Sequence, residues 1–148
     1  MQYPHVCLFI GHRDTSADLY PDILEAVKKL IAEGVTEFWS GGYGNFDHLG
    51  EKAVLQCKQQ GANVKLVLVL AYLPDERKDD YGRFDEIIRP ELGEGHIPPR
   101  YAIARRNAVI ARQAGHVISG VQYTWGGAAK TLAIAQRNGA VIHEVIRK

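Results

Sequence analysis

Short apolar runs alternate with helix-like stretches along most of the chain. The apolar runs lack polar alternation, which is typical of strands buried on both faces in a parallel sheet; they are His5–Ile10, Glu37–Ser40, Val64–Tyr72, His116–Val121 and Ala140–Val145. The stretches between them have helical spacing and stop at or close to a glycine, a C-terminal cap signal; they are Leu19–Glu33, Asp47–Gln60, Tyr101–Gln113 and Ala128–Arg137. This order predicts βαβ units and a three-layer α/β sandwich.

Length and composition restrict the class of protein. The length of 148 residues predicts one domain, residues 1–148. The composition, 46% apolar and 24% charged residues, is typical of a folded globular protein. The longest apolar run, Leu66–Leu73, is too short to cross a bilayer, and no signal peptide precedes the first strand. We therefore expect a cytoplasmic protein with no membrane partner.

The charge and the cysteines exclude further classes. The 18 Lys and Arg against 17 Asp and Glu leave a net charge of +1, so we expect no nucleic acid as partner. Cys7 and Cys57 stand alone, without a CxxC pair or a metal knuckle. We expect two buried free thiols and no metal site.

A long connection, at about residues 73–100, interrupts the regular order. It contains four prolines, and nearly half of the acidic residues lie in the segment Asp75–Glu94. The composition predicts a loop with a short turn of helix or an edge strand around Phe84–Arg89. A solvated connection and a lid over a ligand site both fit it.

Glycine-rich turns follow three of the predicted strands. They are Gly11-His12-Arg13-Asp14, Ser40-Gly41-Gly42-Tyr43-Gly44 and the segment from Gly120 to Gly127. Ligands bind at the carboxyl ends of parallel strands, and free N–H groups at helix starts favour anions. The turns therefore predict a phosphate or carboxylate site.

The common cofactor motifs do not fit these turns. For a P-loop ending at Lys130-Thr131, Thr124 and Ala129 stand where glycines are required. For a dinucleotide fingerprint beginning at Gly42, Asp47 replaces the third glycine. We expect neither Walker-type ATP binding nor a nicotinamide or flavin cofactor.

The predicted helix after the long loop carries two candidate ligand-binding side chains. At 100° per residue, Asn107 falls in the middle of the apolar face and Arg106 at its edge, whereas Arg105 and Arg112 point to solvent. A buried amide needs partners. Asn107 therefore either caps a neighbouring strand or loop, or helps Arg106 to hold a ribose, a phosphate or a catalytic carboxylate.

Asp47 and Glu51 lie one helical turn apart beside the second glycine turn. Such a pair can raise one pKa and supply a nucleophile or general base for cleaving an N-glycosidic bond. The alternative is that the two acids cap N–H groups at the start of the helix. His12, at the end of the first strand, is a further candidate for contact with a ligand.

These motifs resemble the SLOG superfamily, named after Smf/DprA and the LOG enzymes and including YpsA-like proteins. The resemblance rests on residues 40–44 with Asp47, on Arg106-Asn107, and on Gly126-Gly127 with Thr131, and it covers nearly the whole chain. It implies a Rossmann-like three-layer sandwich with a mostly parallel sheet of five to seven strands, binding a nucleotide-derived ligand. The turn at Gly126-Gly127 lacks the Pro and Glu of LOG-type phosphoribohydrolases.

The sequence thus predicts a module that binds a nucleotide or nucleotide-derived phosphate ligand, as a sensor or regulatory protein and as a homo-oligomer. The expected ligand-binding residues are Gly11, His12, Arg13, Ser40, Gly41, Gly42, Gly44, Arg106, Asn107, Gly126, Gly127 and Thr131. Two alternatives stay open: an N-glycosidase or phosphoribohydrolase using Asp47 and Glu51, and a protein that binds single-stranded nucleic acid.

Overall fold

Six parallel strands form one sheet in the order β4-β3-β2-β1-β5-β6. The computed structural model describes residues 2–71, 81–89 and 98–146. The strands are β1 (Tyr3–Ile10), β2 (Glu37–Ser40), β3 (Lys65–Val69), β4 (Glu86–Ile88), β5 (Ala114–Ser119) and β6 (Val141–Glu144). The predicted α/β sheet is confirmed, and the segment around Phe84–Arg89 supplies the edge strand β4.

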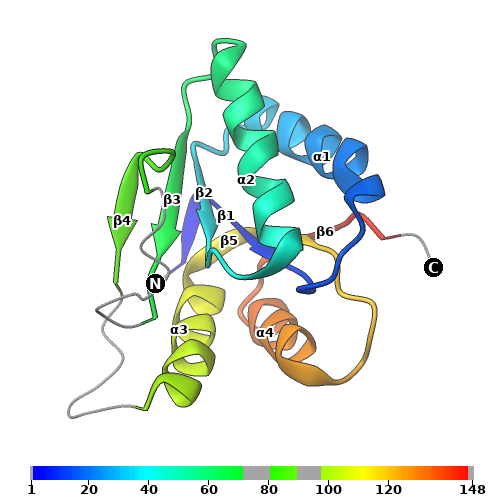
Figure 1. Cartoon of the computed structure of the whole chain (residues 1–148), viewed down its shortest axis with the longest axis vertical. Helices are drawn as coiled ribbons and strands as arrows, with labels where there is room; N and C mark the ends of the chain where they lie inside the picture. The colour runs from blue at the N-terminus through cyan, green and yellow to red at the C-terminus, as the bar shows by residue number, and fades with distance from the viewer. Residues whose placement is uncertain (1, 72–80, 90–97, 147–148) are drawn as a thin grey trace.

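Helices cover both faces of the sheet and complete the three layers (Figure 1). One face carries α1 (Tyr20–Ala32) and α2 (Gly44–Gln59), and the other carries α3 (Pro99–Gln113) and α4 (Gly126–Arg137). A 3₁₀ turn, η1 (Ala17–Leu19), precedes α1. Helices α2 and α4 begin a few residues earlier than predicted, so the glycine turns run directly into them.

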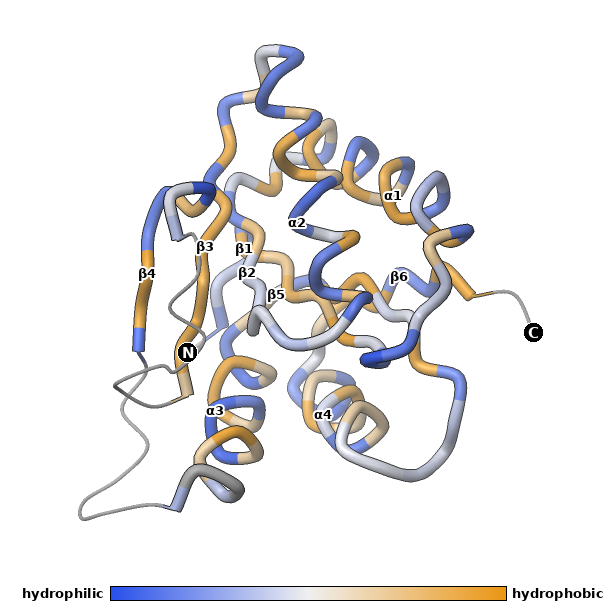
Figure 2. The backbone as a smooth tube through the Cα atoms, in the orientation of Figure 1, coloured by the Kyte–Doolittle hydropathy of each residue, from blue (hydrophilic) through white to orange (hydrophobic). Residues whose placement is uncertain are grey.

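The core is divided between the two faces of the sheet. Phe38, Phe46 and Leu30 belong to the cluster under α1 and α2. Ala111 and Ala135 belong to the cluster under α3 and α4 and are fully buried. The hydropathy colouring shows β3 as an almost continuous hydrophobic segment, as expected for a strand buried on both faces (Figure 2). Both cysteines are buried and free, as predicted.

The strand order places a reversal at β1. From β1 the chain proceeds to β2, β3 and β4 on one side, and later to β5 and β6 on the other. Ligands of open parallel sheets bind at the carboxyl ends of the strands beside such a reversal. The glycine turns after β1, β2 and β5 therefore lie where a site is expected.

The long predicted loop is only partly described. Much of it, at about 73–100, falls in residues 72–80 and 90–97, outside the described residues, so its predicted role as a lid stays untested. Among the described helices, none combines the length and the apolar character needed to span a membrane.

Candidate functional site

A cavity of about 200 Å³ opens at the carboxyl edge of the sheet, between the turns after β1 and β2 and the first turn of α4. Its lining includes these predicted site residues: Gly11, Arg13, Gly41, Asp47, Arg106, Asn107, Gly127 and Thr131. His12, Ser40, Gly42, Gly44, Glu51 and Gly126 are not part of the lining. The fold thus brings segments that are far apart in the sequence to one cavity. The ligand-binding roles of these residues stay predictions.

A buried carboxylate holds the turn after β2. Glu51 on α2 is 3% exposed, and its Oε2 accepts a 2.5 Å hydrogen bond from the hydroxyl of Ser40. The Oγ of Ser40 in turn accepts a hydrogen bond from the N–H of Gly42 at 3.0 Å. The other carboxylate oxygen, Oε1, accepts from Nε of Arg83 at 3.0 Å. These bonds fix the glycine turn relative to α2.

Gly44 joins the first two turns of the site. Its φ of +82° lies in the left-handed region, and a Cβ atom at this position would lie 2.6 Å from Cα of Arg13. The N–H of the next residue, Asn45, donates to the carbonyl oxygen of Arg13 at 2.9 Å. Only glycine combines this φ with so close an approach of two backbones. This contact holds the turn that carries Arg13 at the cavity.

Arg106 is more buried than the helical wheel predicts. Placed at the edge of the apolar face of α3, it is only 2% exposed. Its Nη1 donates to the carbonyl oxygens of Val69 at 2.7 Å and Gly41 at 3.4 Å, and its Nε donates to Oδ1 of Asn107 at 2.9 Å. The guanidinium reaches beyond its own helix to the ends of β2 and β3, which a helical wheel does not show. Arg106 therefore holds the turn at Gly41 through a hydrogen bond to its carbonyl oxygen.

Several polar groups around the cavity are placed to meet an anion. The side chain of Arg13 is exposed, and Arg13 and Asn107 both line the cavity. Helix α4 begins at Gly126 with no side-chain cap and no acidic residue in its first turn. The N–H groups of an uncapped helix start carry partial positive charge. The lining therefore combines a cation, an amide and a helix start with one carboxylate, that of Asp47.

The two acidic residues are both engaged. Oδ2 of Asp47 accepts a hydrogen bond at 3.3 Å from the N–H of Tyr43, the N-cap residue of α2, as an acid in the first turn of a helix does in a capping box. Glu51 is bonded to Ser40 and Arg83 and does not line the cavity. The bond of Asp47 fits the capping alternative, whereas the two bonds of Glu51 come from side chains and not from N–H groups of the helix start. A catalytic role of the pair in N-glycosidic cleavage stays a prediction.

An aromatic ladder made of His12, Tyr123 and Trp125 stands beside the cavity. Ring centroids are 5.0 Å apart between His12 and Tyr123 and 4.7 Å apart between Tyr123 and Trp125. Nε2 of His12 accepts from the N–H of Gln122 at 2.9 Å, which ties the turn after β1 to the loop before α4. Tyr123 is 45% exposed and Trp125 is 68% exposed.

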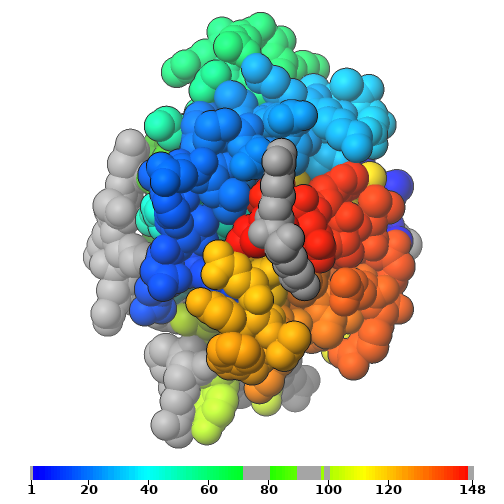
Figure 3. All heavy atoms as spheres, turned by 90° about the vertical axis from the view of Figure 1, so that its right-hand side faces the viewer, coloured from blue at the N-terminus to red at the C-terminus, as the bar shows by residue number. Residues whose placement is uncertain are grey.

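The sequence reasoning did not single out Tyr123 and Trp125. Residues 120–127 were interpreted as a glycine turn. Two large aromatic residues, Tyr123 and Trp125, stand two apart in this loop, and that spacing indicates an exposed aromatic surface. In the space-filling view, the segment around residue 120, in yellow-orange, lies at the surface next to the orange α4 segment (Figure 3). The ladder residues do not line the cavity but neighbour its lining along the chain: His12 lies between Gly11 and Arg13, and Trp125 lies two residues before Gly127.

Comparison with known proteins identifies the fold. No protein-family model and no curated protein matches the chain. Among solved structures, DNA processing protein A (DprA) from Streptococcus pneumoniae matches 96% of the chain at a TM-score of 0.71 and 21% identity. DprA from Helicobacter pylori, described for its single-stranded DNA binding mode, matches 98% at a TM-score of 0.70 and 14% identity. The chain covers 50% and 66% of the length of these two proteins.

These structures contradict one expectation. The balanced net charge predicted that nucleic acid is not a partner, yet the two matched structures are of DNA processing protein A, one with a described single-stranded DNA binding mode. Net charge averages over the chain and says little about one edge of the sheet, where Arg13 and an uncapped helix start lie together. The chain has the Rossmann-like fold of DprA, as its resemblance to the SLOG superfamily predicted.

Proposed function

We propose that this chain binds single-stranded nucleic acid at the carboxyl edge of its sheet. The observation that carries the proposal is the aromatic ladder, in which the rings of Tyr123 and Trp125 are exposed, near a cavity that Arg13 lines. Stacking of a base on an aromatic side chain contributes about 1–3 kcal/mol and needs an unpaired base. The ladder therefore favours a single strand over a duplex.

The backbone of the strand would lie over the cavity. Arg13 and the N-terminal end of α4 are the groups that would meet its phosphates. The cavity volume of about 200 Å³ is below the roughly 300–1,000 Å³ of sites that enclose a whole small-molecule ligand. A phosphate with its sugar fits this volume better than a dinucleotide cofactor does. The single-stranded DNA binding mode described for Helicobacter pylori DprA, which has the same fold, agrees with this proposal.

A direct binding measurement tests the proposal. Fluorescence anisotropy is recorded with a labelled oligothymidylate and with a blunt duplex of equal length. We expect the single strand to bind at least about tenfold more tightly than the duplex, because only unpaired bases reach the ladder. Its affinity will fall as salt rises, because bound phosphates release counterions. Equal or tighter binding of the duplex, or no binding of the strand at low salt, would disprove the proposal.

A free nucleotide is the second candidate ligand for the same cavity. The observation that favours it is the polar lining of the cavity, which includes Asn107 and Thr131, whose hydroxyl donates to the carbonyl oxygen of Gly127. A nucleoside monophosphate that competes with the oligonucleotide for the cavity would support a nucleotide-binding regulatory protein. A strand that stays bound in saturating mononucleotide would favour the nucleic acid alone.

A further inference from the structure

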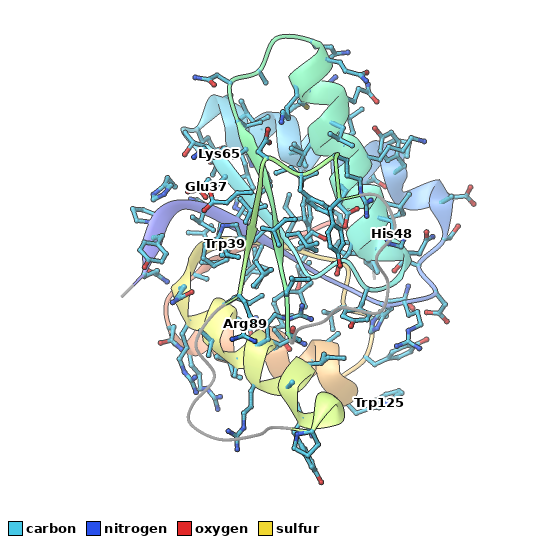
Figure 4. The ribbon with its side chains drawn as sticks, turned by 60° about the vertical axis from the view of Figure 1, so that its left-hand side comes forward. Glu37, Trp39, His48, Lys65, Arg89 and Trp125 are labelled. Atoms are coloured by element: carbon cyan, nitrogen blue, oxygen red, sulfur yellow. The ribbon has the colours of Figure 1, made fainter. Side chains whose placement is uncertain are left out.

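The loop that carries Tyr123 and Trp125 is tied to the core through His12. Residues 122–125 are all exposed, and Trp125 lies at the edge of the molecule beside α4 (Figure 4). Among the described residues, a single hydrogen bond joins residues 122–124 to another segment of the chain. It runs from the N–H of Gln122 to Nε2 of His12 at 2.9 Å. The position of the two exposed rings therefore depends on His12.

His12 itself is anchored in the turn after β1. Its carbonyl oxygen accepts from the hydroxyl of Thr15 at 2.9 Å and from the N–H of Phe46 at 3.3 Å. Thr15 is 7% exposed and Phe46 is 1% exposed, so both donors belong to the buried part of the structure. The ring of His12 also lies against that of Tyr123, with the centroids 5.0 Å apart. His12 thus connects the core to the exposed loop.

The direction of the Gln122 bond determines the protonation state of His12 that supports it. A backbone N–H can only donate, so Nε2 must present its lone pair, and the ring hydrogen lies on Nδ1. An imidazolium carries a hydrogen on both nitrogens and has no acceptor left. Histidine is the side chain that ordinarily changes charge between pH 5 and 8. A His12 ring that takes up a proton in mild acid therefore loses this bond.

We infer that His12 is a positioning residue, which holds Tyr123 and Trp125 in place for stacking while its ring is neutral and releases them when the ring is protonated. The inference rests on the proposed function for its ligand, a single-stranded nucleic acid. His12 does not line the cavity that would meet the phosphates. Its role is therefore to place the ladder and not to bind the backbone of the strand, so the strand should bind less tightly as the pH falls.

The segments around His12 carry other charged and titratable groups. Its own turn continues with Arg13, Asp14 and Asp18, the start of α2 carries Asp47 and His48, the loop carries Tyr123, and α4 beyond the loop carries Lys130. Because a second histidine is among them, pH alone does not isolate His12. Variants of His12 leave all of these groups in place, so a difference from the parent chain belongs to His12.

Two variants separate the acceptor of His12 from its ring. His12→Gln keeps an acceptor, because Oε1 of Gln stands as many bonds from the backbone as Nε2 of His does, and it cannot titrate. His12→Phe keeps a ring beside Tyr123 and has no acceptor. The matched control is His5→Gln on β1, a histidine whose side chain is 47% exposed and pairs with Glu37.

The affinity for a labelled oligothymidylate is measured by fluorescence anisotropy at about pH 7.5 and about pH 5.5, at constant ionic strength. We expect the parent chain and His5→Gln to bind roughly 2- to 10-fold more weakly at the lower pH, the effect of losing one hydrogen bond. His12→Phe should show a loss of this size already at the higher pH. His12→Gln should recover most of that loss, and both His12 variants should depend less on pH than the parent chain does.

The indole resonance of Trp125 reports on the ladder without nucleic acid. The ¹H–¹⁵N spectrum contains one indole signal for each of the two tryptophans, and the variant Trp125→Phe assigns them. We expect the Trp125 signal to move between the two pH values in the parent chain and to move less in both His12 variants. If the parent chain binds no strand at either pH, the proposed function fails, and the Trp125 signal alone decides the role of His12.

Three outcomes would overturn the inference. The first is His12→Phe binding the strand as tightly as the parent chain at the higher pH, which leaves no role for the acceptor. The second is binding by the parent chain that tightens in acid, with no such change in His12→Gln, which makes the imidazolium a cation for the phosphates. The third is a Trp125 signal with the same pH dependence in the parent chain and in both His12 variants.

Discussion

The hydroxyl of Ser40, at the end of β2, donates a 2.5 Å hydrogen bond to Glu51, a carboxylate that is 3% exposed and also pairs with Arg83. Because the Oγ of Ser40 also accepts from the N–H of Gly42, one buried side chain on α2 controls the shape of the glycine turn. Glu51, one of the two acids that the sequence offers for catalysis, thus also supports the backbone of the glycine turn.

Replacing Glu51 should therefore destabilise the fold. Glu51→Ala removes the acceptor of the hydrogen bonds from the Ser40 hydroxyl and from Nε of Arg83, and removing one member of a buried pair costs about 3–5 kcal/mol. Since Arg83 is partly exposed, we expect a loss of about 2–3 kcal/mol in the free energy of unfolding. Glu51→Gln, which keeps an acceptor for Ser40, should lose less.

Urea denaturation measures this difference, with the exposed Glu25→Ala on α1 as control, for which a change within about 0.5 kcal/mol is expected. A Glu51→Ala variant as stable as the parent chain would contradict the structural role.

Gly44 should tolerate alanine less well than another left-handed glycine. Gly44→Ala meets both the unfavourable φ of +82° and the backbone of Arg13 at 2.6 Å, whereas Gly61→Ala meets an unfavourable φ of +100° with nothing within 4 Å. The conformation alone costs about 1–2 kcal/mol. We expect Gly44→Ala to lose more stability than Gly61→Ala by at least about 1 kcal/mol, measured by thermal and urea unfolding. Equal losses would show that the two backbones do not pack closely.

The sequence predicted the parallel sheet because buried strands and amphipathic helices each have a local pattern of apolar residues, continuous in the strands and helically spaced in the helices. It also placed the glycine turns correctly, since glycine clusters after strands are local too. The burial of Arg106 could not be predicted, because its partner, the carbonyl oxygen of Val69, lies on another strand. The ladder was missed because loop residues such as Tyr123 and Trp125 follow no period.

The pairing of His143 with His116 predicts a loss of stability at acidic pH. Their rings lie 5.5 Å apart, and burial, followed by the charge of His116, lowers the pKa of His143 below its usual 6.5. The folded chain thus holds His143 neutral while the unfolded chain protonates it. Stability is then fully present above the unfolded pKa of 6.5 and falls as the pH drops below it.

Urea unfolding at about pH 7.5 and about pH 5.5 measures this effect. His143→Gln cannot titrate, so it should lose less stability between the two values than the parent chain does. The same loss in both proteins would assign the pH dependence to other groups.

Cys7 should be inert in the folded protein. Its side chain is fully buried, and this burial raises the pKa of its thiol far above the ordinary value. Burial also raises the pKa of Cys57, which is 4% exposed. Since the thiolate is the reactive form, we expect no fast reaction of the native chain with a disulfide reagent at about pH 8, and two equivalents after unfolding in urea. One fast equivalent in the native state would contradict this packing.

The most direct test of the central claim is the affinity of Trp125→Ala for a single-stranded oligonucleotide. Trp125 is 68% exposed, so its removal leaves the core intact, and the exposed Val141→Ala on β6 serves as control. Loss of one stacked base, worth about 1–3 kcal/mol, should weaken binding roughly 5- to 150-fold, with the control unchanged. A Trp125→Ala variant that binds the strand as tightly as the parent chain would contradict the proposal that the ladder holds the bases.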